Sequence, residues 1–404
     1  MHKQLITIAL CCLFAGVSVG AEQSFPEFSP AKVPFSAIAS NLEYKGIAVK
    51  EADYTVWGAA PLIDDQGKMH LYVARWPEKN VDPAWRKSSE IVHYQADHPE
   101  GPFKFVSVVI TGSGIKDAWD RYAPSNPDIQ RIDGKYVLTY IGNSDYHQPP
   151  HPLNQQIGMM IADSPYGPWK KAGDNGLVLD DSQDPEHFSH GHQVVNPTLA
   201  KFKGKYFLYY KTANHTNRGW RTVFAAAMAD KLEGPYRHPD RPFSAGDVVI
   251  EDASAFIWKD KLCLLTTDNH GLVTGIRGGG ALWVSKDGKT CDPALVQVGF
   301  DKIWRYYPNY DSKKATKIYG AAKLERPKVL MIDGKPAYLY GASGWEITGL
   351  PRTVNYVFKI NLPDDAGPVP DAKETASETF KMNLDAPINT WNEAVPLSNR
   401  KVKK

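Results

Sequence analysis

A short hairpin motif recurs five times along this chain of 404 residues. Each copy is a polar turn that contains a lysine and is followed by an alternating apolar strand; the copies begin at Gln66, Asp133, Lys203, Lys259 and Asp333. Apolar runs on both sides of a tight turn predict two antiparallel strands. The lysines of successive copies are 56 to 74 residues apart. A β unit repeated at this period predicts a repeat architecture, here a β-propeller.

A second repeat supports the first and sets the number of strands in each unit. Gly-Pro followed by an aromatic residue comes about 30 residues after each of the first three hairpins, at Gly101-Pro102, Gly167-Pro168 and Gly234-Pro235, and Asp287-Gly288 takes that place in the fourth unit. Gly-Pro is a turn signal, so each unit predicts two hairpins in series. We therefore expect an all-β propeller of four-stranded antiparallel blades. Five blades are counted, and seven blades of about 50 residues stay open as an alternative.

The chain divides into four parts. Lys3, the apolar run Leu5–Val17 and small residues before a cleavage site near Gly20–Ala21 predict a signal peptide over residues 1–20, and hence a secreted or periplasmic protein. Residues 21–50 form a proline-rich lead-in, in which Ile47–Val49 is expected to close the ring beside the last blade. The propeller itself spans 51–363 and carries the catalytic function. A polar tail, 364–404, follows.

Composition excludes several classes of partner. The formal charge of +2 is too small to indicate nucleic acid, and no apolar run beyond the N-terminus is long enough to cross a membrane. We expect a monomer. Beyond the signal peptide only Cys263 and Cys291 remain, either as one disulfide or as two thiols. The sequence contains no strong metal motif and requires no cofactor, while a bound divalent ion stays open.

In a propeller the starts of the inner strands and the loops after the second strands line one face, so candidate site residues are sought there. The candidates for catalysis are His147, His192, Tyr209, Tyr210 and Arg221. The candidates for substrate binding are Asn126, Asn143, Asn196, Lys211, His270 and Arg326. Each also has an ordinary structural interpretation, since Asn-Pro is common turn chemistry and a lone histidine is more often structural than catalytic.

Two chemistries compete for this face. β-Elimination from a uronic acid needs an arginine to neutralise the carboxylate, with a histidine and a tyrosine to move protons, and residues of these types converge in the third unit. Hydrolysis of a glycosidic bond needs two carboxylates instead. For that reaction the candidates are Asp53, Asp252, Asp268 and Glu325. A propeller that only binds glycans is a third interpretation.

Several segments also resemble known families. The resemblance rests on Trp57-Gly-Ala-Ala-Pro-Leu-Ile, His70-Leu-Tyr-Val-Ala-Arg75-Trp76, the Asn126-Pro and Asn196-Pro strand starts, Asp268-Asn-His270-Gly and Leu324-Glu-Arg326-Pro. These resemble secreted propellers of polysaccharide-degrading bacteria that are grouped with the arabinanase-clan glycoside hydrolases. Ser189-His-Gly-His192 and the histidine, tyrosine and arginine content are more similar to propeller-type ulvan lyases.

The ulvan lyase resemblance implies a histidine and a tyrosine for proton transfer and an arginine that neutralises the uronate. We therefore expect a lyase acting on an anionic, uronate-containing sulfated polysaccharide, with an arabinanase-like glycoside hydrolase as the alternative.

Overall fold

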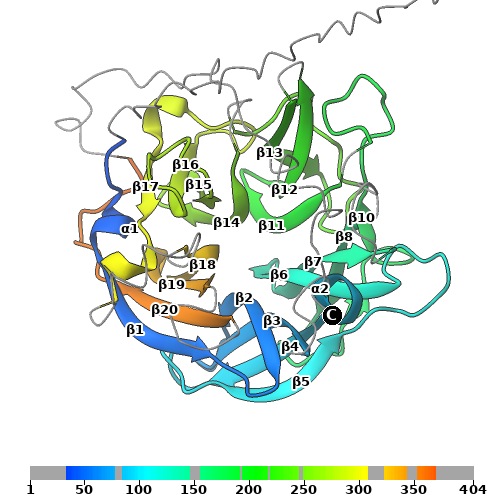
Figure 1. The fold of residues 1–404 in the computed structure, drawn as a ribbon, viewed down its shortest axis with the longest axis horizontal. Coiled ribbons are helices and arrows are strands. Elements are labelled where there is room, and N and C mark those ends of the chain that lie inside the picture. The colour runs from blue at the N-terminus through cyan, green and yellow to red at the C-terminus, as the bar shows by residue number, and fades with distance from the viewer. Residues whose placement is uncertain are drawn as a thin grey trace, which may run out of the picture.

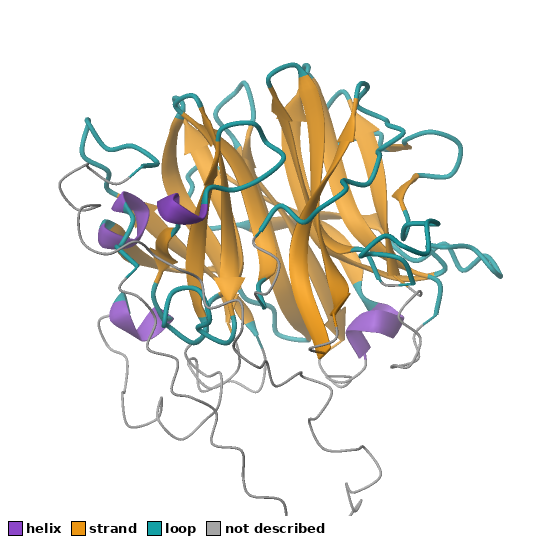
Figure 2. Cartoon of the chain, turned by 90° about the horizontal axis from the view of Figure 1, so that it is seen from above, coloured by secondary structure: helices purple, strands orange, loops and turns teal. Residues whose placement is uncertain are grey.

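A computed structural model of the chain describes residues 33–77, 84–145, 155–191, 193–216, 219–244, 249–307, 323–343 and 353–369. Within this part of the chain, five antiparallel sheets surround a central axis (Figure 1). Seen at right angles to that view, the strands of the sheets lie between loops at both ends of the molecule (Figure 2). The predicted five-bladed propeller is therefore confirmed.

The first three blades follow one another along the chain. Blade 1 contains β2 (Tyr54–Ile63), β3 (Met69–Pro77), β4 (Glu90–Ala96) and β5 (Lys104–Ile110). Blade 2 contains β6 (Tyr122–Ile132), β7 (Lys135–Asn143), β8 (Gln155–Ala162) and the short β9 (Lys170–Lys171) and β10 (Leu177–Leu179), which both pair with β8. Blade 3 contains β11 (Val195–Phe202), β12 (Lys205–Thr216) and β13 (Gly219–Ala229).

The last two blades complete the ring. Blade 4 contains β14 (Glu251–Trp258), β15 (Lys261–Asp268), β16 (Gly279–Ser285) and β17 (Gln297–Phe300). Blade 5 contains β18 (Glu325–Ile332), β19 (Lys335–Ser343), β20 (Val354–Ile360) and, from the other end of the chain, β1 (Leu42–Val49). The described helices are single turns: α1 (Ala37–Ser40), α2 (Ala84–Ser88), η1 (Pro293–Leu295) and η2 (Ile303–Arg305). None of them is long and apolar enough to cross a membrane.

The ring is closed by the pairing of β1 with β20, in which Leu42 lies opposite Ile360. Asn361 donates a further hydrogen bond to Glu43, at 2.9 Å. The sequence predicts a closing strand at Ile47–Val49, and the structure begins that strand five residues earlier. The fifth blade is therefore built from both ends of the propeller sequence.

Three of the repeated hairpins have the turn that their sequences predict. Asp133-Gly134, Lys203-Gly204 and Asp333-Gly334 have positive φ at both positions, from 49° to 76°. Two consecutive residues in this region form a type I′ turn, whose twist matches that of the flanking strands. The Gly-Pro bonds at Pro102, Pro168 and Pro235 are cis.

Blade 3 differs from the expected four strands. Within the described residues, blade 3 is extended beyond β13 by an isolated bridge between Met228 and Arg237 and by hydrogen bonds from the amides of Phe243 and Ser244 to the carbonyl of Phe224. Pro239 and Pro242 lie in this outer segment. A proline has no N–H to donate to a ladder, so a regular fourth strand does not form here.

Apolar side chains fill the spaces between blades, and each of the five interfaces has its own buried cluster. Tyr209 belongs to the cluster between blades 3 and 4, and Tyr210 to the one between blades 2 and 3. The alternation of a strand directs these neighbours to opposite faces of one blade, and both faces are buried. Cys263 and Cys291 are free thiols rather than a disulfide.

A buried polar chain lies at the interface of blades 1 and 2. Asp64 contacts Nε2 of His70 at 3.1 Å, and Nδ1 of His70 contacts Nε2 of His93 at 2.8 Å. Tyr72 stacks on His93 with ring centroids 5.0 Å apart, and Tyr166 from blade 2 meets both histidines edge-on. An ionised carboxylate only accepts hydrogen bonds, so His70 donates through Nε2 and accepts from His93 through Nδ1.

Candidate active site

Each inner strand contains a β-bulge near its start, at one end of the axis. At each bulge the pairing register breaks and one residue has a positive φ of 49° to 63°. Such a conformation is unusual for any residue other than glycine, yet four of the five positions carry a side chain. The inner strands of neighbouring blades lie side by side around the axis, so these positions form a ring. We name it the bulge ring: Gly58, Asn126, Asn196, Asp252 and Arg326.

Three predicted substrate-binding residues belong to the bulge ring, where they connect blades. Asn126 donates from Nδ2 to Oδ1 of Asn196 at 2.6 Å. Arg326 donates to Asp252 from its backbone N–H, at 3.2 Å, and from Nη1, at 3.1 Å. The Arg326 side chain is fully buried, and its Nε would lie 3.2 Å from a Cβ placed on Gly58. We call this end of the axis, where the bulge ring lies, the mouth.

Two glutamates immediately precede bulge residues in neighbouring blades. Glu251 begins β14 and pairs with Lys211 at 3.0 Å, while Glu325 begins β18 and pairs with Lys323 at 2.9 Å. Their side chains keep 32% and 18% of their surface exposed, so solvent reaches both from the mouth. Because the two glutamates hold equivalent positions in adjacent repeats, they lie at the same level along the axis.

The surroundings of Glu325 shift the pKa of its carboxyl upward. Burial raises the pKa of the Glu325 carboxyl, and the charges of Asp252 and Glu251 raise it further, against the opposing effect of Lys323. A carboxyl with a raised pKa, next to another carboxylate, is an arrangement typical of acid catalysis.

A hydrogen-bonded loop between β15 and β16 adds basic groups to this mouth. The carboxylate of Asp268 is fully buried and accepts hydrogen bonds from three backbone amides and one hydroxyl, those of Leu272, Val273, Thr274 and Thr274 Oγ1, at 2.8 to 3.0 Å. The loop carries His270 and Arg277. Burial lowers the pKa of His270, the charges of Arg277 and Lys323 lower it further, and Glu251 opposes them, so these groups lie near one another.

The predicted catalytic tyrosines do not face the mouth. Tyr209 is fully buried and donates to the carbonyl of Gly288 at 2.8 Å. Tyr210 is equally buried and contacts Nδ1 of His238 at 2.7 Å. Burial raises the pKa of both hydroxyls, which disfavours the phenolate form. Neither position offers a hydroxyl to a substrate in the mouth.

The remaining catalytic candidates have no described side-chain position. Arg221 pairs through its backbone with Asn214, whereas Tyr210 pairs with Ala225. Arg221 is therefore four positions along β13 from the partner of Tyr210, roughly 13 Å away. His147 and His192 lie outside the described residues.

Asn143 and the other carboxylate candidates have structural environments. Asn143 is fully buried, donates to the carbonyl of Ala123 and accepts from Gln155. Asp252 is paired with Arg326, and Asp268 accepts hydrogen bonds from the backbone of the loop between β15 and β16. Asp53 is exposed in the turn before β2. Of the four predicted carboxylates, Asp252 and Glu325 lie at the mouth; Asp252 is paired with Arg326, and Glu325 has a second acid beside it.

That second acid, Glu251, is not among the carboxylates that the sequence predicts. The sequence does contain a signal for Glu251, because Glu251-Asp252 and Glu325-Arg326 occupy equivalent places in the repeat. The described residues contain no group of three His, Cys, Asp or Glu side chains that could hold a metal ion.

Comparison with known proteins identifies the fold. Neither a protein-family model nor a curated protein matches the sequence. Zg3597, a family 117 glycoside hydrolase of Zobellia galactanivorans, superposes with a TM-score of 0.58 at 17% identity, over 80% of this chain and 91% of that one. BT0996, from an RGII complex, gives 0.58 at 13% identity, over 84% and 94%. The GH43_1 enzyme of Xanthomonas citri in complex with xylose gives 0.50 at 12% identity, over 80% and 92%. The chain thus shares the five-bladed propeller fold of these proteins.

Proposed function

We propose that this protein is a glycoside hydrolase that acts on a polysaccharide, with Glu325 as the general acid and Glu251 as the second carboxylate. The observation that carries the proposal is the pair of glutamates at equivalent positions of neighbouring inner strands, one of them with a raised pKa. Glycosidases use such a pair because one carboxyl protonates the leaving oxygen while the other acts ionised. Several propellers of the same fold are named as glycoside hydrolases, which agrees with this chemistry.

Basic groups around the glutamates favour an anionic glycan. Lys211, Lys323 and Arg277 bring positive charge to the mouth, and His270 lies among them. Such groups attract the carboxylate or sulfate substituents of a polysaccharide. Secretion and a monomeric state remain predictions from the sequence.

Elimination is the expectation from the sequence, but the geometry supports it less well. The predicted mechanism pairs a histidine with Tyr209 or Tyr210, and the tyrosine hydroxyl would have to lie within hydrogen-bond reach of the sugar. Tyr209 and Tyr210 are fully buried between blades and already hydrogen-bonded there. The predicted elimination mechanism assigns no role to the two glutamates at the mouth, whereas hydrolysis uses both.

The test is to incubate the protein with neutral and anionic polysaccharides, ulvan included. New reducing ends and the ultraviolet absorbance of unsaturated uronate are followed in parallel. We expect reducing ends to appear without a rise in absorbance. Glu325→Gln should lower kcat by about 10²-fold or more, because general acid catalysis contributes on that order, and Glu251→Gln should lower it comparably.

Glu43→Gln is the matched control, since Glu43 lies on the outer strand β1 and pairs with Lys45. It should leave kcat unchanged. A rise in absorbance would identify elimination instead, and full activity of Glu325→Gln would remove Glu325 as the acid.

A further inference from the structure

A second ring of side chains lies two residues after the bulge ring, deeper along the axis. At three of the five positions a side-chain oxygen accepts a hydrogen bond from the backbone N–H of the next blade. Asp128 accepts from Leu199 at 3.2 Å, Thr198 from Ala255 at 3.0 Å, and Ser254 from Val329 at 3.0 Å. These bonds join blades 2 to 3, 3 to 4 and 4 to 5.

Blade 1 interrupts the pattern. The backbone N–H that would donate the next bond would be that of residue 61, which is a proline and has no N–H. Blade 1 also places Ala60 in the ring, and a methyl group cannot accept a hydrogen bond. The repeated contact is therefore absent between blades 5 and 1 and between blades 1 and 2, and the small Ala60 side chain leaves space beside the axis.

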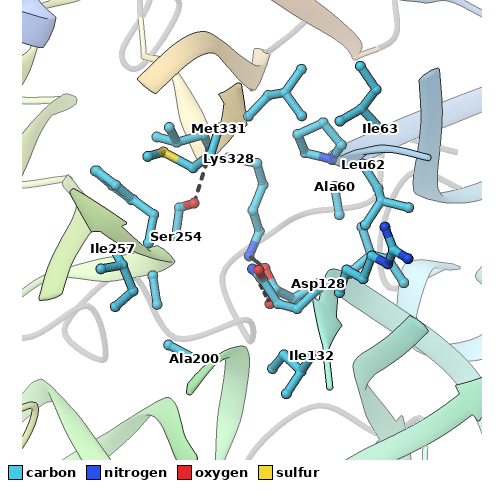
Figure 3. A pocket seen from close by; sticks show the side chains of 18 of the residues that line it. Ala60, Leu62, Ile63, Asp128, Ile132, Ala200, Ser254, Ile257, Lys328 and Met331 are labelled. Atoms are coloured by element: carbon cyan, nitrogen blue, oxygen red, sulfur yellow. Dashed lines mark hydrogen bonds and ion pairs between the residues drawn. The ribbon is translucent and has the colours of Figure 1, made fainter. Parts of the chain in front are cut away.

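Lys328 of blade 5 occupies this gap and spans the axis. Its ammonium pairs with Oδ1 of Asp128 in blade 2 and donates to the carbonyl of Ala253 in blade 4, at 2.7 Å. Figure 3 shows the side chain extending through a cavity of about 430 Å³ to Asp128, with Ser254 beside it. Both charged side chains are at most 2% exposed.

Lys328 and its partner Ala253 lie on the same two strands as the proposed catalytic glutamates. Lys328 is three residues after Glu325 on the same strand, and Ala253 is two residues after Glu251. Asp252, which follows Glu251, also pairs with Arg326, which follows Glu325, across the same two strands. We propose that Lys328 is a positioning residue that fixes the separation of Glu251 and Glu325 by bracing the starts of β14 and β18 against blade 2. This role rests on the function proposed above.

The charged groups near Glu325 and Lys328 set the direction in which the pKa of Glu325 is expected to change when Lys328 is replaced. Glu325 faces Lys323, Asp252 and Glu251, while Lys328 faces Asp128, Arg326 and Asp252. Without the brace, water enters and the carboxylates separate. Both changes reduce the effects that hold the pKa of Glu325 above its ordinary value.

The experiment uses the double variant Lys328→Met with Asp128→Asn. It removes both charges together, and the asparagine oxygen can still accept from Leu199. Carboxyl ¹³C titration should show the midpoint of Glu325 falling by about half a pH unit or more. With a substrate from the tests above, kcat should fall about tenfold or more while KM stays within about threefold, since misplacement of about 1 Å can cost 10²-fold.

His93→Gln is the matched control, because it also alters a buried polar contact but lies between blades 1 and 2. It should lower the thermal midpoint without moving the Glu325 titration or kcat. A double variant that only loses thermal stability would overturn the proposal. If the double variant fails to fold, Asp128→Asn alone should move the Glu325 midpoint in the same direction by at least about 0.2 units, and an unchanged midpoint would overturn it.

The titration needs no substrate, so the positioning role can be judged even if no hydrolysis is found. Failure of the proposed function would appear as wild-type protein without glycosidase activity. Failure of this inference would appear as an unmoved Glu325 midpoint.

Discussion

Arg326 shows how much one bulge residue depends on its neighbours. Its backbone has a φ of 55° and its side chain is fully buried, with Asp252 on one side and Gly58 on the other. Within the described part of the chain, Nε and Nη2 have no hydrogen-bond partner. An arginine is held in this way only where the surrounding ring leaves it no alternative position.

Gly58→Ala should destabilise the protein more than an ordinary glycine substitution. Its φ of 63° costs an alanine about 1 to 2 kcal/mol, and the new Cβ would also press on Arg326. Gly67→Ala is the matched control, because Gly67 has a φ of 75° and nothing lies within 4 Å of the point that its Cβ would occupy. Urea denaturation should give a larger loss of unfolding free energy for Gly58→Ala. Equal losses of unfolding free energy would show that the Arg326 side chain moves aside without reducing stability.

At the scale of elements, the hairpins are predictable and the bulges are not. Asp133-Gly134 or Lys203-Gly204 determines its turn through local backbone preferences, so the sequence around it is sufficient. The bulge at Glu325-Arg326 depends instead on Asp252 and Gly58 in other blades. The same reason explains why the sequence does not single out Glu251, since its partner acid is recognised only once the blades are aligned.

The loop between β15 and β16 is expected to be both a stabilising and a functional element. Asp268→Ala would leave the amides of Leu272, Val273 and Thr274 without their acceptor, at a cost of about 1 to 3 kcal/mol for each group that water does not reach. His270 and Arg277 should then lose their positions, so kcat/KM should fall about tenfold or more in the glycan assay.

Asp287→Ala provides the comparison for this loop. Asp287 accepts from the amides of Lys289 and Thr290 in the turn beyond β16, away from the mouth. It should lower the unfolding free energy but leave kcat/KM intact. Equal activity of the two variants would show that the β15–β16 loop does not position substrate-binding groups.

At the scale of the whole molecule, the repeat predicts five blades and their closure because every unit must bury both faces against its neighbours. The candidate active site cannot be predicted from the repeat in the same way. Tyr209 and Tyr210 look similar to exposed aromatic residues in the sequence, and only the packing of blades 2, 3 and 4 removes them from solvent.

The pH dependence of global stability should reveal the polar chain between blades 1 and 2. Burial and the charge of His70 lower the pKa of His93 to about 3, against 6.5 for the unfolded residue. The unfolded state therefore takes up this proton first as the pH falls. The stabilising contribution is complete above about pH 6.5 and is lost progressively between about pH 6.5 and 3.

His93→Gln should flatten this dependence, because the variant has one titrating group fewer. Between about pH 6 and pH 4, its unfolding free energy in urea should fall by up to about 1.4 kcal/mol per pH unit less than that of the wild type. An unchanged slope would mean that other groups cause the acid sensitivity.

The closing strand has a consequence for how the protein is made. Glu43 and Asn361, which bond across β1 and β20, are separated by 318 positions. During synthesis, β1 emerges early and has no partner until the final blade has left the ribosome. A truncated chain therefore keeps an unpaired edge, and quality control by proteases can distinguish it from the finished ring.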